Sequence, residues 1–480
     1  VTAAAEAAKE RGQEGKWVFT LHKPSLIPFL QYAENRILRE NIYSASINVG
    51  SNGNEYDNRA IAGRMAALRA ERAVLLGYET HAHFILEENM AKVPENVYRL
   101  LDQLWTPALN MAKSEAAAMQ ALIDKERGDF KLQSWDWWYY AEKVKKAKYD
   151  LDEEALRPYF KLENVIDGVF AVAGKLWGLH FEERTDIPKY HPDVKVFEVK
   201  EADGTHIGIL YTDYFPRASK RGGAWMSAFR KQSRKEGEKI TPVIVNCGNF
   251  SKPTADKPSL ISMEEALTLF HEFGHALHGL LSDRTYPSLT GTDVPQDFVE
   301  LPSQIMENWG GHPEVMKMYA RHYLTNEPIP DELLEKLKKS KLFNRGFAET
   351  EYLAACYLDM DWHTQKTAEE QDCLVFEKAS LDRIGLIPEI IVRYRSPYFR
   401  HIFSGGYSAG YYSYVWAEVL DADAFEAFKE KGLFDRETAD RFRKYVLSAG
   451  GTDDPMVLYK RFRGVEPKVD AVLKRKGFLK

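Results

Sequence analysis

Apolar residues recur at helical spacing along most of the chain, and this pattern predicts a mainly α-helical protein. Residues 58–76 show it clearly, with a possible N-cap at Asn58 or Asp57 and a glycine, Gly77, that can close the helix. The apolar residues that form one stripe along this predicted helix are Ile61, Met65, Leu68 and Leu75. Residues 85–128 and 152–178 are predicted to be helical on the same grounds.

The pattern changes to strict alternation of apolar and polar residues near position 194. Residues 194–200 alternate, Asp203-Gly204 can form a turn, and residues 207–211 resume the alternation, which predicts a β-hairpin. Residues 241–246 form a third predicted strand. The edge of this small sheet could bind an extended peptide by strand addition, or the sheet could be purely structural; the sequence leaves both interpretations open.

Helical spacing returns after residue 262. Ser262 and Glu265 form a predicted capping box, with serine at the N-cap and glutamate three residues later. Apolar residues surround the following segment on most sides, so we expect a buried helix. Gly274 lies inside it, at a cost of about 1 kcal/mol relative to alanine. The glycine is either tolerated there or required by the close approach of another part of the backbone.

Two histidines on this helix, His271 and His275, lie four residues apart, with Glu272 beside the first. Four helical residues turn about 400° and rise about 6 Å, so both imidazoles leave one face and can hold one metal ion. Glu272 lies at the edge of that face, where it can reach a water on the metal. The spacing is typical of zinc hydrolases, although a hydrogen-bonded pair of helix histidines is the alternative.

A zinc site of this kind needs a third protein ligand and one open position. The acidic residues that follow and have suitable chemistry are Asp293, Asp297, Glu300 and Glu307. Spacing alone does not choose among them. Gln304 and Glu307 follow Glu300 at helical spacing and could brace a ligand imidazole.

A third segment with chemical potential spans residues 394–416. Gly405-Gly406 predicts a flexible turn after His401. Tyr407, Tyr411 and Tyr414 follow at i, i+4 and i+7, so their hydroxyl groups are expected to share a helix face. An aromatic core stripe is one interpretation. The other is a set of hydrogen-bond donors for the oxyanion of a tetrahedral intermediate.

Composition narrows the class of protein without identifying it. The chain has 480 residues, enough for two or more lobes, with 44% hydrophobic and 28% charged residues. Its formal net charge of −6 provides no basic surface for nucleic acid, and its apolar runs are far shorter than the ~20 residues of a membrane helix. Three scattered cysteines, Cys247, Cys356 and Cys373, suit free thiols in a reducing compartment.

The residues around the histidine pair resemble a known family. Residues 270–280 and 291–304 are similar to the thimet oligopeptidase/peptidyl-dipeptidase family of zinc metallopeptidases, of the gluzincin type. The resemblance implies one zinc ion on His271, His275 and Glu300, with Glu272 as general base. In residues 394–416 it implies that Tyr407 and Tyr414 bind substrate and stabilise the transition state, that His401 is a pocket residue and that Tyr411 is structural.

Further strings extend the resemblance over nearly the whole chain and are closest to the bacterial peptidyl-dipeptidases, which release dipeptides from free C-termini. These strings are residues 135–140, 149–152, 191–193, 222–225 and 461–464. An endo-oligopeptidase and a zinc-loaded but inactive peptide-binding protein are the alternatives. Candidates by position for binding a substrate carboxylate are Arg393, Arg395 and Arg400.

Together these features predict a mainly α fold, with helical lobes around a deep substrate cleft and a small antiparallel β-sheet beside the metal helix. We expect a helical lobe in residues 1–180 and a catalytic part in 181–480, with the sheet within 190–250. The expected partners are short peptides, with neither nucleic acid nor a membrane, and the protein is expected to be a monomer. The chain starts Val1-Thr2-Ala3 without methionine. We therefore expect a missing N-terminal segment, and favour the cytoplasm while leaving export open.

Overall fold

The computed structural model describes residues 2–149, 155–217, 219–253 and 256–479. The chain forms two compact units, each assembled from separated segments. The first unit contains residues 1–87, 91–150 and 339–412, and the second contains residues 88–90, 151–338 and 413–480. The contiguous division at residue 180 remains a sequence-based prediction, and the two units are described separately below.

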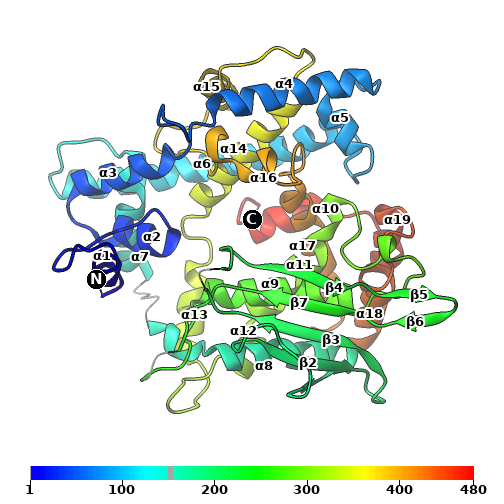
Figure 1. The fold of residues 1–480 in the computed structure, drawn as a ribbon. Helices are drawn as coiled ribbons and strands as arrows, with labels where there is room; N and C mark the ends of the chain where they lie inside the picture. Colours follow the sequence, from blue (N-terminus) through cyan, green and yellow to red (C-terminus); the bar gives the residue numbers. More distant parts are fainter. Residues whose placement is uncertain (1, 150–154, 218, 254–255, 480) are drawn as a thin grey trace. The chain divides into compact units, whose positions relative to one another are not determined.

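The first unit is helical. A long helix, α6 (Pro94–Lys125), packs along α14 (Arg345–His363) (Figure 1). The other α-helices of this unit are α1 (Thr2–Lys9), α2 (Lys23–Tyr32), α3 (Arg36–Ile47), α4 (Arg59–Leu75), α5 (His81–Leu86), α7 (Trp137–Tyr149), α15 (Cys373–Arg383) and α16 (Arg400–Phe403). Short 3-10 turns at Ser134–Asp136 and Ser396–Tyr398 precede α7 and α16.

Helix α4 has the predicted length, but its apolar stripe is not its buried face. Ile61, Leu68 and Leu75 are 55%, 44% and 79% exposed. The face that packs inward consists of Ala62, Gly63, Ala66, Ala67, Ala70 and Ala73. Small residues allow a close approach, because a Cβ atom at Gly63 would lie 2.4 Å from the carbonyl oxygen of Gln371. Backbone proximity, rather than hydrophobicity, therefore selects the packing face of α4.

The predicted helix over residues 85–128 is interrupted. Helix α5 ends at Leu86, and α6 begins at Pro94 after a non-helical segment. Proline is favoured in the first turn of a helix, where its missing N–H costs no hydrogen bond. Pro94 is therefore the local signal that divides the predicted element. Residues 152–154 of the predicted 152–178 helix lie outside the described residues. The remainder contains a 3-10 turn at Arg157–Tyr159 followed by α8 (Leu162–Trp177).

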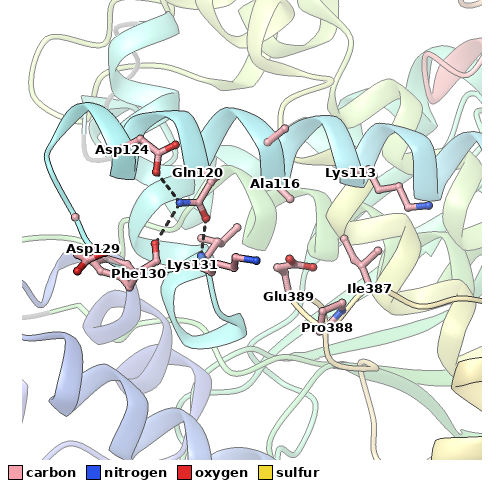
Figure 2. Close-up of a pocket in the computed structure, with 13 residues that line it drawn as sticks. Lys113, Ala116, Gln120, Asp124, Asp129, Phe130, Lys131, Ile387, Pro388 and Glu389 are labelled. Atoms are coloured by element: carbon pink, nitrogen blue, oxygen red, sulfur yellow. Dashed lines mark hydrogen bonds between the residues drawn. The ribbon is translucent and has the colours of Figure 1, made fainter.

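A groove of about 890 Å³ lies in the first unit beside α6 (Figure 2). Gln120 joins the helix to the loop that lines the groove: its amide donates to Asp124 Oδ1 and to the Phe130 carbonyl, and its carbonyl accepts from Leu132 N–H. Lys113 and Lys131 also line it. None of the residues predicted for catalysis or metal binding lines this groove.

The second unit contains the sheet. Its five-stranded sheet has the order β1-β2-β3-β7-β4, and β5 and β6 pair separately. The strands are β1 (His180–Glu183), β2 (Lys195–Lys200), β3 (His206–Asp213), β4 (Trp225–Arg230), β5 (Ser233–Lys235), β6 (Glu238–Ile240) and β7 (Val243–Cys247). The predicted hairpin is β2–β3, and the predicted third strand is β7.

The sheet is antiparallel except between β3 and β7, which run parallel with Ile209 opposite Val243. The predicted small antiparallel sheet is therefore present, with one parallel pairing that the sequence did not indicate. The chain leaves β3, forms β4 to β6 and returns as β7, so β7 enters the sheet in the same direction as β3. Strand β4 pairs only with β7 and forms one edge of the sheet.

Helix α9 (Met263–Leu280) connects the sheet of the second unit to the other helices of that unit. Helix α9 packs against β7 and β4 and also against α11 (Leu301–Gly310) (Figure 1). The remaining α-helices are α8, α10 (Gln296–Val299), α12 (Pro313–Tyr319), α13 (Asp331–Ser340), α17 (Ser413–Lys431), α18 (Arg436–Phe442), α19 (Pro455–Arg463) and α20 (Val469–Arg475). No helix in the described part of the chain has both the length and the apolar composition needed to cross a lipid bilayer.

Candidate active site

The predicted metal helix forms as the sequence indicates. Ser262 caps α9 by accepting from the Glu265 N–H, and the Glu265 carboxylate accepts from the Ser262 N–H, which completes the capping box. The helix is largely buried, as its apolar pattern predicts. His271 and His275 leave the same side of α9, with ring centroids 5.0 Å apart.

Glu300 lies beside both histidines. Its Oε2 atom is 3.3 Å from His271 Nε2 and 3.1 Å from His275 Nε2. One ligand atom from each of His271, His275 and Glu300 lies within 4.8 Å of the others, and we call these three residues the metal trio. Of the four acidic residues that the sequence left open, Glu300 is therefore the one that contacts both histidines.

The close contact between α9 and α11 depends on Gly274. A Cβ atom at this position would lie 2.2 Å from the Pro302 carbonyl oxygen and 2.7 Å from Ser303 Cα. Only glycine fits, so the interpretation that another backbone approaches here is confirmed. The approach brings the first turn of α11, and Glu300 just before it, against the histidine face of α9. Ser303 then donates from Oγ to Glu300 Oε2 over 2.9 Å and orients the carboxylate.

The other acidic candidates have different roles. Asp293 pairs with Lys231 at 2.5 Å, and the buried Asp297 accepts from the Met90 N–H over 2.9 Å. Glu307 lies 2.7 Å from His271 Nδ1, where it can hold the ring from behind, as expected for a brace. Gln304 does not brace an imidazole, because its amide donates to the Tyr414 carbonyl oxygen over 3.1 Å.

The geometry of the trio fits a tetrahedral zinc ion. With zinc–ligand bonds of about 2.0–2.1 Å, the ligand atoms of a tetrahedral site lie about 3.3 Å apart. The Nε2–Oε2 distances of 3.3 and 3.1 Å are close to that value. His271 lies between the carboxylates of Glu300 and Glu307. These negative charges favour a positive charge beside Nε2, which either a proton or a metal ion can supply. Two imidazoles and one carboxylate are also a donor set that zinc prefers.

Electrostatics at the trio favour the ionised carboxylate. Burial lowers the pKa of His271, but hydrogen bonds with Glu300 and Glu307 outweigh burial and raise it well above its usual value. Burial alone would raise the pKa of Glu300, yet the two histidines hold it well below its usual range. Glu300 is therefore a carboxylate at neutral pH, as a metal ligand must be.

Glu272 has the properties of a general base. It is 6% exposed, and burial raises the pKa of its carboxyl group. Its Oε2 atom accepts no hydrogen bond from any residue that the structure describes. The carboxylate can therefore accept a proton from a water, and its raised pKa makes it a better base near neutral pH.

Tyr414 lies in the first turn of α17 and belongs to the same unit as the trio. Helix α17 packs against α11 and α10. The hydrogen bond from Gln304 to the Tyr414 carbonyl ties the start of α17 to the helix that follows Glu300. The backbone at Tyr414 is thus fixed relative to the residues around Glu300.

His401 and Tyr407 belong to the first unit, in α16 and in the loop that follows it. We call residues 404–412 the tyrosine loop. The His401 ring lies 5.9 Å from the Tyr407 ring and 5.2 Å from the Tyr411 ring, measured between centroids. Burial lowers the pKa of His401, and nearby Arg393 and Arg400 lower it further, so the ring is neutral at pH 7.

The three tyrosines do not share a helix face, contrary to the sequence-based expectation. Tyr407 and Tyr411 lie in non-helical turns, and α17 begins only at Ser413. The reason is a left-handed residue, Ala409, with a φ of 52°. A left-handed residue cannot continue a right-handed helix. The residues just before Ser413 are therefore not helical, and the i, i+4 and i+7 spacing does not place the three tyrosine side chains on one face.

The three arginines that could bind a substrate carboxylate have different surroundings in the structure. Arg395 already pairs with Glu377 at 2.7 Å and donates to the Ile47 carbonyl oxygen. Arg393 and Arg400 are exposed, and no carboxylate in the described part of the chain lies within 4.0 Å of either guanidinium. Arg393 also lies over the Tyr352 ring, 5.6 Å from its centroid, in the aromatic cluster that includes Tyr411.

Known proteins are similar to this chain over nearly its whole length. Residues 29–478 match the model of Peptidase family M3. The chain is 43% identical over 480 residues to dipeptidyl carboxypeptidase of Escherichia coli (strain K12), covering 99% of this chain and 70% of that protein. It is 39% identical over 482 residues to oligopeptidase A of the same organism, covering 99% of this chain and 71% of the relative.

Solved structures agree on the fold. A carboxypeptidase from Pyrococcus furiosus has a TM-score of 0.51 at 14% identity, covering 96% of this chain and 81% of its own. An M32 carboxypeptidase from Deinococcus radiodurans R1 has a TM-score of 0.52 at 14% identity, covering 96% and 80%. The mainly helical fold and the matched family define a metallopeptidase. The chain belongs to peptidase family M3, which confirms the resemblance drawn from its motifs.

Proposed function

We propose that this protein is a zinc peptidyl-dipeptidase that releases dipeptides from the C-termini of short, unfolded peptides. The observation that carries the proposal is the metal trio with Glu272 on the same helix. The 43% identity to a dipeptidyl carboxypeptidase supports the choice of bond. The 39% identity to an oligopeptidase keeps an endo-oligopeptidase as the second candidate. An inactive peptide-binding protein is disfavoured, because no structural role requires Glu272.

Each residue of the proposed active site has a separate role in peptide hydrolysis. His271, His275 and Glu300 would hold one zinc ion, and Glu307 would hold the His271 ring. When bound, zinc supplies a Lewis acid that polarises the scissile carbonyl. Glu272 accepts a proton from the attacking water and passes it to the leaving amine. Tyr407 and Tyr414 donate to the developing oxyanion, and His401, as a neutral imidazole, contacts the substrate.

We also propose a reducing compartment such as the cytoplasm and a monomeric protein. Cys247, Cys356 and Cys373 are all buried free thiols, which supports a reducing compartment. The peptide substrate is the expected partner, and the edge strand β4 is a candidate for pairing with an extended peptide.

Tyr414→Phe should lower kcat by about 10- to 100-fold with little change in KM, the range expected for losing one hydrogen bond to a charged group. The reason is that an oxyanion donor acts mainly in the transition state. Steady-state kinetics on a defined decapeptide measure both constants. Tyr286→Phe, at a tyrosine that is 64% exposed, is the control. A rise in KM alone would make Tyr414 a substrate contact instead of an oxyanion donor.

Amidation of the peptide's C-terminus should lower kcat/KM by about 10- to 100-fold, because it removes the charge that an exopeptidase must bind. Mass spectrometry of the products from free and amidated decapeptides measures the effect and identifies the first bond cut. Equal cleavage of the two peptides, or first cuts in mid-chain, would favour the endo-oligopeptidase.

We assign the carboxylate contact to Arg393, because Arg395 is already paired and Arg393 lies in the aromatic cluster around His401. Arg393→Ala should reduce the preference for the free peptide over the amidated one. Arg400→Ala, at an exposed arginine nearby, is the matched control and should keep the preference. A preference that survives in Arg393→Ala and disappears in Arg400→Ala would transfer the assignment to Arg400.

A further inference from the structure

The two ends of the tyrosine loop differ in their exposure to solvent. At its start Ser404, Gly405 and Gly406 are exposed, and a Cβ atom at Gly406 would meet no other atom within 4 Å. At its end Ala409 and Tyr411 are buried. Ala409 has a φ of 52°, a left-handed conformation that is unfavourable for any residue with a Cβ atom. Something outside the loop must hold this end in place.

Asp359 holds it from α14. This carboxylate is completely buried. Its Oδ1 accepts from the Ala409 N–H over 2.9 Å, and its Oδ2 accepts from the Tyr411 N–H over 2.8 Å. Hydrogen bonds to an ionised acceptor are about twice as strong as those between neutral groups. Both oxygens of one buried carboxylate therefore bind the backbone of the loop.

His363, one turn further along α14, orients Asp359. Its Nδ1 lies 2.8 Å from Asp359 Oδ1, and its Nε2 lies 2.8 Å from Arg69 Nη1. A guanidinium can only donate hydrogen bonds, so Nε2 must accept from Arg69 and the ring proton is on Nδ1. That proton faces Asp359, where the Oδ1 atom and the backbone carbonyl oxygen each lie 2.8 Å from Nδ1. Arg69 therefore fixes the orientation of the His363 ring that contacts Asp359.

A second histidine holds the neighbouring residue of the loop. Arg72 Nη2 lies 3.2 Å from His81 Nδ1, so the proton of His81 is on Nε2, 3.0 Å from Ser408 Oγ. Burial lowers the pKa of His81 to about 2, which keeps the ring neutral. Ser408, Ala409 and Tyr411 are thus bound by groups from α5 and α14, all within the first unit.

We propose that Asp359 is a positioning residue for Tyr407. Tyr407 lies two residues before Ala409, its carbonyl oxygen accepts from the Gly410 N–H over 2.9 Å, and its N–H donates to the His401 carbonyl oxygen over 3.1 Å. An anchored Ala409 therefore fixes the backbone of Tyr407, while Gly405-Gly406 allow the opposite end to adjust. The inference rests on the proposed function, in which Tyr407 acts on the substrate.

Asp359→Asn is the direct test. The amide keeps the shape of the carboxylate but turns one acceptor into a donor that faces a backbone N–H. We expect kcat/KM on the decapeptide to fall about 10- to 100-fold, with unchanged zinc content. Asp361→Asn is the matched control on the same helix, because Asp361 accepts from Tyr98, Ser380 and Arg383 and does not contact the loop. An equal loss in both variants would overturn the proposal.

Two double variants separate positioning from general stability. Ala409→Gly removes the left-handed penalty, so it should recover part of the loss caused by Asp359→Asn. In a Tyr407→Phe background, Asp359→Asn should lower kcat/KM by a smaller factor than it does in the wild type. The reason is that a residue that acts by positioning the Tyr407 hydroxyl group has no further effect once that group is absent. If Asp359→Asn does not fold, His363→Gln takes its place in both pairs, with an expected loss of about 3- to 10-fold, since it weakens the brace and keeps the carboxylate.

The outcomes distinguish this inference from the proposed function. If Tyr407→Phe lowers kcat/KM but its loss multiplies with that of Asp359→Asn, positioning by Asp359 is overturned and the function of Tyr407 stands. If Tyr407→Phe has no effect, the assigned role of Tyr407 falls, and the positioning role falls with it. Recovery in the Ala409→Gly pair together with a reduced loss in the Tyr407→Phe pair supports the proposal.

Discussion

Glu272→Gln should lower kcat by about 100- to 10,000-fold, the range typical of a lost general base. Glutamine has nearly the same shape as glutamate but cannot accept a proton from water at neutral pH. Glu272 is 6% exposed and its Oε2 accepts no hydrogen bond from a described residue, so the variant loses no partner that the fold needs. Zinc content and the affinity for a peptide inhibitor should therefore stay unchanged.

Rapid measurement of product formation, together with elemental analysis of the same samples, tests this expectation. Glu264→Gln is the matched control, because Glu264 lies in the first turn of the same helix and is exposed. A variant that loses zinc in parallel with activity would show that Glu272 supports the metal site instead of accepting the proton. A variant that keeps more than a tenth of the activity would assign the base to another group.

Glu300→Ala should remove most of the bound zinc and with it nearly all activity. Two imidazoles alone leave the ion without the carboxylate that balances its charge, and a site with two protein ligands is far weaker than one with three. Ser303, which donates to Glu300 Oε2, would also lose its partner. Elemental analysis after dialysis against a mild chelator measures the retained metal.

Asp293→Ala is the control for this change, since Asp293 was an equal candidate on chemistry and pairs instead with Lys231. It should keep its zinc. Full zinc in Glu300→Ala would remove Glu300 from the ligand set. Loss of zinc from Asp293→Ala at the same chelator concentration would show that the assay reports general instability.

The rigidity of the trio has an identifiable source in the fold. Gly274 permits the close contact of α9 and α11, and that contact places Glu300 beside His271 and His275. Glu307, further along α11, lies against the Nδ1 side of His271. The donor atoms of the trio are consequently held by two helices that also pack on each other.

Local patterns in the sequence were sufficient to predict those elements that depend only on residues close together in the chain. The capping box at Ser262 and Glu265 and the β2–β3 hairpin formed as predicted, because caps and tight turns are set by neighbouring residues. The two histidines four residues apart share one side of α9 for the same reason, since helix geometry alone places them. The family resemblance also rested on such local strings, and the comparisons confirm it.

Long-range contacts decided the rest. Glu300 could not be chosen over Asp293 or Asp297 by spacing, because the choice depends on the contact between Gly274 and Pro302, which joins two helices. The buried face of α4 is its alanine side, since the neighbouring backbone at Gln371 leaves no room for larger residues.

The tyrosine loop also combines features that are visible in the sequence with a conformation that long-range contacts determine. Its glycines and tyrosines are visible in the sequence, but the helix predicted through Tyr407 and Tyr411 does not form. A carboxylate on another helix, Asp359, binds the backbone of Ala409 and Tyr411 and stabilises a left-handed turn that local propensity disfavours. The sequence thus determined the chemistry and the local elements, because these depend on adjacent residues. The tertiary structure decided which acid meets the histidines and how the loop is held, because those contacts join residues far apart in the chain.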